Sequence, residues 1–137
     1  MEPKELIKAA IDARERAYTP YSHFAVGAAL LTAEGKIYPG CNIESASYSP
    51  SNCAERTAFF KAVSEGERKF ASIAIVGGPA GSPISELCPP CGVCRQVMME
   101  FCDPKTFQII LADSESSWKV FTLEELLPHG FGPANLQ

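Results

Sequence analysis

The spacing of hydrophobic residues along the chain predicts several short helices. Near the N-terminus, apolar residues recur every three or four positions from Leu6 to Tyr18, and Pro3 suits a first helical turn. The Thr19-Pro20 pair ends this helix, because the residue before a proline disfavours helical geometry. Later segments with helical spacing and start or stop signals predict further helices at 53–65, at 91–101 and, briefly, from Thr122.

Apolar runs between turn residues predict strands at 24–32, 36–41, 70–76, 107–112 and 118–121. The first two form a hairpin around Glu34-Gly35. The run 70–76 alternates little, so we expect it to be covered on both faces. Strands and helices alternate in the centre of the chain. This order predicts an α/β domain with helices on both faces of one sheet.

Length and composition fit one globular domain over residues 1–137. Hydrophobic residues make up 46% and charged residues 20% of the 137 positions, which is ordinary for such a domain. The longest apolar run, 24–31, is too short to cross a membrane. The first residues lack the basic start and apolar stretch of a signal peptide, so we expect a cytoplasmic protein.

The charge pattern restricts the partner. The net charge is −4, and acidic and basic residues are mixed, without a stripe of Lys and Arg. This distribution argues against duplex DNA or long RNA as a partner and favours a small substrate.

Six cysteines are many for a chain of this size. An even number in a secreted protein indicates disulfides, but a protein of the reducing cytosol more often uses them for metal binding or catalysis. We expect Cys41, Cys88 and Cys102 to be small buried hydrophobic residues.

The other three cysteines form a motif with metal-ligand spacing. Cys53 precedes Ala54 and Glu55, and Cys91 and Cys94 form a C-x-x-C. Cys91 and Cys94 project to one side in the first turn of a helix, and helix starts favour the thiolate form. A structural zinc site has four protein ligands, whereas a catalytic one has three and an open position. The motif therefore predicts a catalytic zinc site.

Glu55 and Arg56, which follow Cys53 closely in the sequence, are candidates for roles in catalysis at the zinc site. No histidine lies nearby, so Glu55 is the candidate for moving protons, although acids are also common in first helical turns. Three thiolates leave excess negative charge on zinc. The Arg56 guanidinium would withdraw charge from the sulfurs. The alternative for Arg56 is a surface helix residue.

These motifs resemble the short-chain, homotetrameric cytidine deaminases along nearly the whole chain. The matching segments are 18–30, 40–44, 53–58, 90–96 and 126–128. The resemblance implies a three-layer α/β/α sandwich with a five-stranded mixed sheet. It also implies hydrolytic deamination of cytidine and deoxycytidine to uridine and deoxyuridine in pyrimidine salvage. One zinc per subunit would be held by Cys53, Cys91 and Cys94, with Glu55 as proton shuttle.

The same resemblance implies a substrate pocket. Phe24 would pack against the pyrimidine, Asn42 and Glu44 would hold the ribose hydroxyls, and the backbone N–H of Ala54 would contact the base carbonyl. Without the resemblance, Phe24 is equally a core residue and Asn42 a turn residue. Ser45 and Val93 depart from the family pattern, which puts the shape of the pocket or of the subunit interface in doubt.

The resemblance further implies a homotetramer in which neighbouring subunits complete each pocket. Tyr48 and Phe131 match positions that reach across an interface. An aromatic residue in a polar C-terminal tail is easier to explain if another chain covers it.

Several alternatives stay open. A blasticidin-S deaminase has a similar length and zinc motif, although the Asn42 and Glu44 pair favours an ordinary nucleoside. A structural zinc module that binds another protein needs a fourth ligand, for which His23, His129 and Cys88 are the candidates. The C-x-x-C alone also fits a redox couple. A deaminase of polynucleotides lacks support, because no basic channel is visible.

Overall fold

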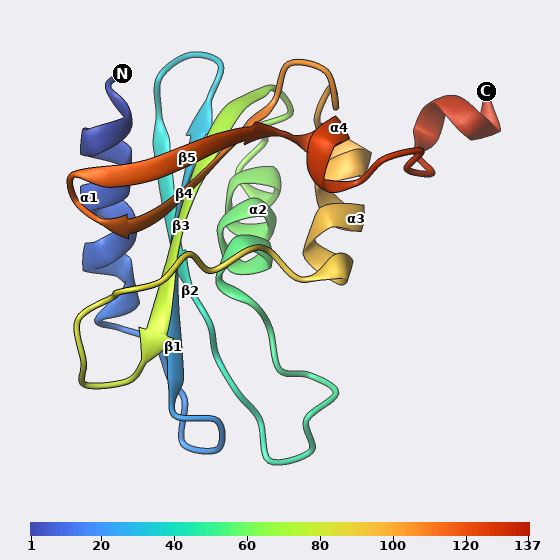
Figure 1. Cartoon of the computed structure of the whole chain (residues 1–137). Helices are drawn as coiled ribbons and strands as arrows, with labels where there is room; N and C mark the ends of the chain where they lie inside the picture. The colour runs from blue at the N-terminus through green and yellow to red at the C-terminus, as the bar shows by residue number, and fades with distance from the viewer.

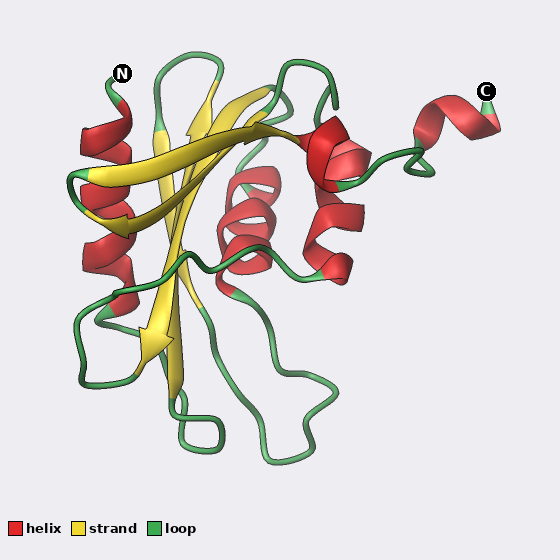
Figure 2. Ribbon diagram, viewed as in Figure 1, coloured by secondary structure: helices red, strands yellow, loops and turns green.

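The computed structural model describes all residues from 1 to 137 and contains one five-stranded sheet between helices (Figures 1 and 2). The elements are, in chain order, α1 Pro3–Arg14, β1 Phe24–Thr32, β2 Ile37–Cys41, α2 Ala54–Ser64, β3 Phe70–Pro79, α3 Gly92–Phe101, β4 Gln108–Ser114, β5 Ser117–Thr122, α4 Leu123–Leu126 and the 3₁₀ helix η1 Pro133–Leu136. The strand order is β2-β1-β3-β4-β5.

The sheet is mixed, as predicted. Only β3 and β4 pair in parallel, and the other neighbours are antiparallel. A parallel pair needs a long crossover connection, and the segment containing α3 supplies it. The antiparallel β1–β2 pair is the predicted hairpin around Gly35, which has the positive φ that glycine tolerates in a turn.

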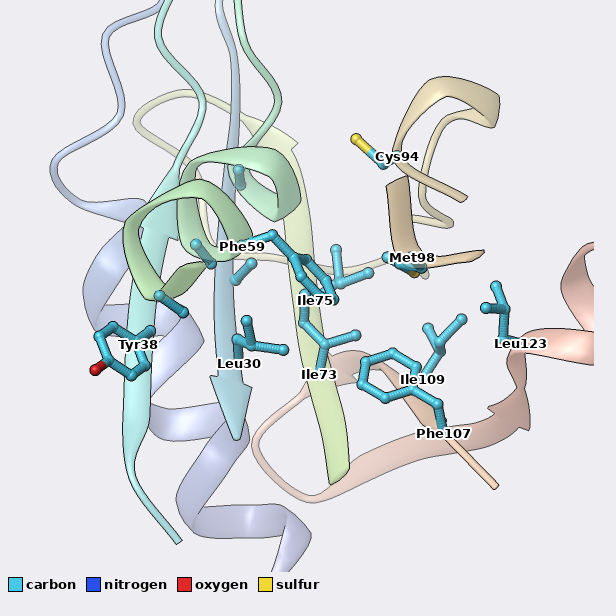
Figure 3. Packing of buried hydrophobic residues seen from close by; sticks show 14 of the residues in the cluster. Leu30, Tyr38, Phe59, Ile73, Ile75, Cys94, Met98, Phe107, Ile109 and Leu123 are labelled. Atoms are coloured by element: carbon cyan, nitrogen blue, oxygen red, sulfur yellow. The ribbon is translucent and has the colours of Figure 1, made fainter. Parts of the chain in front are cut away.

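Helices cover both faces of the sheet. In Figure 1, α1 lies on one side, and α2 and α3 lie on the other. Strand β3 contributes Ile73 and Ile75 to the core under α2 and α3 (Figure 3), and Ala74 and Val76 to the core under α1. This two-sided burial confirms the prediction from its weak alternation. The same period of two places Val26, Ala28 and Leu30 of β1 on the α2 and α3 face.

The structure differs most from the predictions at two element ends and in the C-terminal tail. Helix α1 ends at Arg14, before Tyr18, because Tyr18 pairs with the chain after β2: its N–H donates to the Asn42 carbonyl and its carbonyl accepts from Glu44 N–H. Strand β3 continues to Pro79, where it still pairs with Phe24. The C-terminal tail, expected to be irregular, contains η1. Contacts distant in sequence decide the first two ends.

No helix in the chain combines the length and the apolar character that crossing a bilayer requires.

Candidate metal centre

The sulfurs of Cys53, Cys91 and Cys94 lie within 4.8 Å of one another. Cys53 is the N-cap of α2 and Cys91 is the N-cap of α3, as their spacing predicted. The Sγ–Sγ distances are 3.5 Å between Cys53 and Cys91 and 3.3 Å between Cys91 and Cys94. Thiolates on a tetrahedral zinc are about 3.8 Å apart. Shifts of a few tenths of an ångström therefore bring these two pairs to the spacing of zinc ligands.

A fourth ligand is missing from the group. No histidine, carboxylate or further cysteine belongs to it, so His23, His129 and Cys88 do not complete a closed structural site. Cys88 still lies near the centre. Burial raises the pKa of its thiol to about 11, and the charges of Glu55 and Cys53 add to the effect. Three protein ligands are the arrangement of a catalytic zinc site.

The thiols of Cys53 and Cys94 differ in pKa. Hydrogen bonding from Cys94, together with Arg56, lowers the pKa of the Cys53 thiol to about 5. The same contact with Cys53 raises the pKa of the Cys94 thiol, and its burial contributes. Of these two thiols, Cys53 therefore ionises first. A preformed thiolate is what a metal ion binds.

Glu55 is buried beside these sulfurs, with 3% of its surface exposed. It lies in the first turn of α2. Burial raises the pKa of its carboxyl group to about 7, and the negative charge of Cys53 adds to this shift. A carboxyl group that takes up and releases a proton near neutral pH is suited to acid–base catalysis.

Arg56 points back to the same sulfurs. Its Nη2 donates a hydrogen bond to Cys53 Sγ over 3.4 Å, and its Nε is buried without a hydrogen-bond partner. Burial acts to lower the pKa of the guanidinium, but hydrogen bonds with Cys53 and Cys94 outweigh it, so the pKa is raised. This geometry favours a charge-withdrawing neighbour over a surface helix residue.

The candidate substrate residues lie at the sheet end where α2 and α3 begin. The loops before β1 and after β2 reach the same end (Figure 2). Phe24 opens β1 and is 42% exposed. It continues the face of Val26, Ala28 and Leu30, which is the face that α2 and α3 cover. A partly exposed aromatic on the metal side suits a base better than a core position.

Asn42 and Glu44 already have partners within the chain. Asn42 Oδ1 accepts from Val26 N–H and its Nδ2 donates to the Phe24 carbonyl, both over 2.8 Å. Glu44 Oε1 accepts from the N–H groups of Tyr21 and Ser22 over 3.1 Å, and its Oε2 accepts from the Ser22 hydroxyl. These Ser22 bonds lower the pKa of the Glu44 carboxyl group.

Ser22 is a residue that the sequence analysis missed. Its hydroxyl group also accepts from Phe24 N–H over 3.1 Å, so it connects two candidate substrate residues. The available signal was local: serine commonly accepts from the N–H two residues later in a turn.

Tyr48 and Phe131 are large aromatic residues outside the core. They are 70% and 57% exposed. Tyr48 packs edge-to-face on Tyr21 with ring centroids 6.0 Å apart and lines a cleft of about 310 Å³ together with Glu44. The tail that carries Phe131 is held by α3, because Gln96 Nε2 donates to the Phe131 carbonyl over 2.8 Å. A separate cavity of about 620 Å³ lies at the α1 side and contains none of the predicted site residues.

Residues 1–110 match the family model described as the cytidine and deoxycytidylate deaminase zinc-binding region. A cytidine deaminase of Sporosarcina psychrophila is 48% identical over 136 residues, which cover 99% of this chain and 96% of that protein. A cytidine deaminase of Halalkalibacterium halodurans is 50% identical over 131 residues, covering 96% and 95%.

Solved structures are similar along the same length. The crystal structure of a cytidine deaminase from Burkholderia pseudomallei superposes with a TM-score of 0.85 at 48% identity, covering 96% of this chain and 100% of that one. A cytidine deaminase from Mycobacterium tuberculosis gives a TM-score of 0.80 at 34% identity, covering 96% and 98%.

Proposed function

This chain belongs to the cytidine deaminase family, and on that premise we propose that it catalyses the hydrolytic deamination of cytidine and deoxycytidine to uridine and deoxyuridine in pyrimidine salvage. The observation that carries this conclusion is the three-sulfur group without a fourth ligand, next to the buried carboxyl group of Glu55. The protein works as a single domain over residues 1–137, in the cytoplasm, where thiols stay reduced.

Cys53, Cys91 and Cys94 are the zinc ligands, with one ion per chain. When bound, the ion would supply a Lewis acid that activates a water molecule. Glu55 takes a proton from the attacking water and delivers it to the pyrimidine ring nitrogen. It then takes the proton of the new hydroxyl group and passes it to the departing amine. Its pKa of about 7 supports this role, because both protonation states are accessible at neutral pH. Ammonia leaves and the ring retains the new oxygen.

Arg56 adjusts the charge of the ligand set. Its hydrogen bond to Cys53 Sγ draws negative charge from the sulfur, which strengthens the metal as a Lewis acid. Its unpartnered buried Nε adds a further donor on this side of the centre.

The nucleoside lies between β1 and the start of α2. Phe24 packs against the pyrimidine, and the Ala54 N–H, at the first residue of α2, contacts the base carbonyl. Asn42 and Glu44 hold the ribose hydroxyls with the hydrogen-bonding capacity that their contacts within the chain leave free. Because Glu44 is oriented by Ser22, it stays in place before substrate binds.

The active form is a homotetramer. Tyr48 and Phe131 lie outside the core of their own chain and are exposed enough to enter a neighbour's pocket. Size-exclusion chromatography with light scattering measures the assembly. A fully active monomer would overturn this part of the proposal.

The experiment that tests the function is an ultraviolet absorbance time course of zinc-loaded protein with cytidine, deoxycytidine and blasticidin S in parallel. We expect both nucleosides to be converted and the antibiotic to stay intact. Conversion of blasticidin S alone favours the sister deaminase. Failure on all three substrates with zinc bound contradicts a deaminase function.

A further inference from the structure

Arg14, the last residue of α1, is buried and contacts the sheet from the face opposite the metal centre. Only 8% of its surface is exposed. Its Nε donates to the Ala25 carbonyl over 2.9 Å, and its Nη2 donates to the carbonyls of Gly78 and Pro79 over 3.0 and 2.8 Å. One guanidinium therefore joins the first residues of β1 to the last residues of β3.

The three carbonyls lie at the end of the β1–β3 ladder. Phe24 pairs with Pro79 and Ala25 with Gly78 in the antiparallel β1–β3 ladder. The ladder continues one residue further, because the Ala80 N–H donates to the His23 carbonyl over 2.8 Å. Arg14 adds side-chain bonds to this end of the ladder, on carbonyls of both strands.

A glycine allows the approach. A Cβ added to Gly27 would lie 2.0 Å from the Ala10 carbonyl oxygen and 2.8 Å from Arg14 Cβ. Helix α1 therefore lies directly on the β1 backbone. This close packing holds the end of α1, and with it Arg14, against β1 next to Ala25.

The other edge of the same strand segment is held by Asn42, which pairs with the Phe24 carbonyl and the Val26 N–H. The backbone at Phe24 is consequently held from two sides. Alternate residues of a strand point to opposite faces. The Ala25 side chain borders the same α1-side cavity as Arg14, whereas Phe24 faces the metal side.

We propose that Arg14 is a positioning residue for the nucleoside: it sets the place of Phe24 from behind the sheet and so determines how tightly substrate binds. This inference rests on the proposed function, because it takes Phe24 as the residue that packs on the base. Arg14 contacts neither α2 nor α3 through these bonds, so zinc binding and the proton transfer by Glu55 are independent of it.

The test is the variant Arg14→Lys, since an ammonium group reaches fewer of the three carbonyls than the planar guanidinium. We expect KM for cytidine to rise about tenfold, the effect of losing one or more charge-assisted hydrogen bonds, while kcat stays within about twofold and zinc content stays at one per chain. Arg14→Gln, with two N–H donors and no charge, shifts KM further in the same direction. The matched control is Arg16→Lys on an exposed residue two positions away, with unchanged KM.

A double-mutant cycle separates this role from general stabilisation. In a Phe24→Ala background, Arg14→Lys has little further effect on KM if Arg14 acts through Phe24. An undiminished rise of KM in that background overturns the inference, and so does a fall of kcat with unchanged KM. If wild-type protein leaves cytidine untouched, the proposed function fails. If it is active and Arg14→Lys behaves like Arg16→Lys, only this inference fails.

Discussion

The contact between β2 and α2 controls the position of Cys53, and Gly40→Ala tests it. A Cβ added at Gly40 would lie 2.5 Å from the Ala54 carbonyl oxygen and 2.6 Å from Ala58 N. Both atoms belong to the α2 backbone, so no side chain can turn aside. Ordinary contact begins at 3.4 Å, so strand and helix must separate by about 1 Å.

That displacement has two measurable consequences. Overpacking of this kind costs about 1–3 kcal/mol of unfolding free energy, which lowers the midpoint of urea unfolding by about 1 M. Helix α2 also carries Cys53 away from Cys91 and Cys94 on α3. Zinc–sulfur distances deviate from their ideal value by only about 0.2 Å in a good site. We therefore expect zinc binding to be about tenfold weaker or worse.

The assay is urea unfolding of metal-free protein together with zinc competition against a chromogenic chelator. Gly92→Ala is the matched control, because its added Cβ meets nothing within 4 Å and its site is the first residue of α3. We expect the control to keep both stability and zinc affinity. If Gly40→Ala matches Gly92→Ala in both measurements, the packing of α2 on β2 does not position Cys53.

Three further predictions follow from single contacts. Arg56→Ala removes the donor to Cys53 Sγ, so zinc affinity or kcat falls about 10- to 100-fold; unchanged values in metal competition and steady-state kinetics contradict the role of Arg56. Burial raises the thiol pKa of Cys102, and that of Cys88 to about 11. Both thiols therefore stay protonated at pH 8, and we expect them to react slowly with iodoacetamide in the folded protein and fast in the urea-unfolded chain. Mass spectrometry of the zinc-loaded protein measures the labelling, and rapid labelling of the folded protein would refute this prediction. Ser22→Ala removes the hydroxyl bond to Glu44, which is the main cause of its lowered pKa. We expect this pKa to rise and the acid limb of the pH profile of kcat/KM to move to higher pH; an unmoved limb shows that Glu44 ionisation does not govern binding.

The metal group was predictable because its signals are local. Cys53 with Glu55, and Cys91 with Cys94, stand at helix starts that capping and turn residues mark in the sequence. Strand β3 was recognisable from its continuous apolar run, and its burial on both faces confirmed that interpretation. Short-range periodicity and helix-start signals carry this information without any knowledge of distant contacts.

The spacing of hydrophobic residues could not predict contacts between residues that are distant in sequence. The apolar spacing continued to Tyr18, but pairing of Tyr18 with the segment after β2 ends the helix at Arg14. The sequence pattern gave no indication of the role of Arg14, because its partners Gly78 and Pro79 lie 64 and 65 positions away. Gly27 and Gly40 gave no signal of their close helix contacts, because a glycine in a strand has several explanations.

The most direct test of the account is the comparison of Glu55→Gln with wild-type protein, with bound zinc and cytidine turnover measured on the same samples. Glutamine preserves the size of the side chain and the three sulfur ligands but cannot carry the proton. We predict one zinc per chain in both proteins and a loss of kcat of about 100- to 10,000-fold in the variant. Turnover at the wild-type rate with zinc bound would contradict the assignment of Glu55 as the proton carrier.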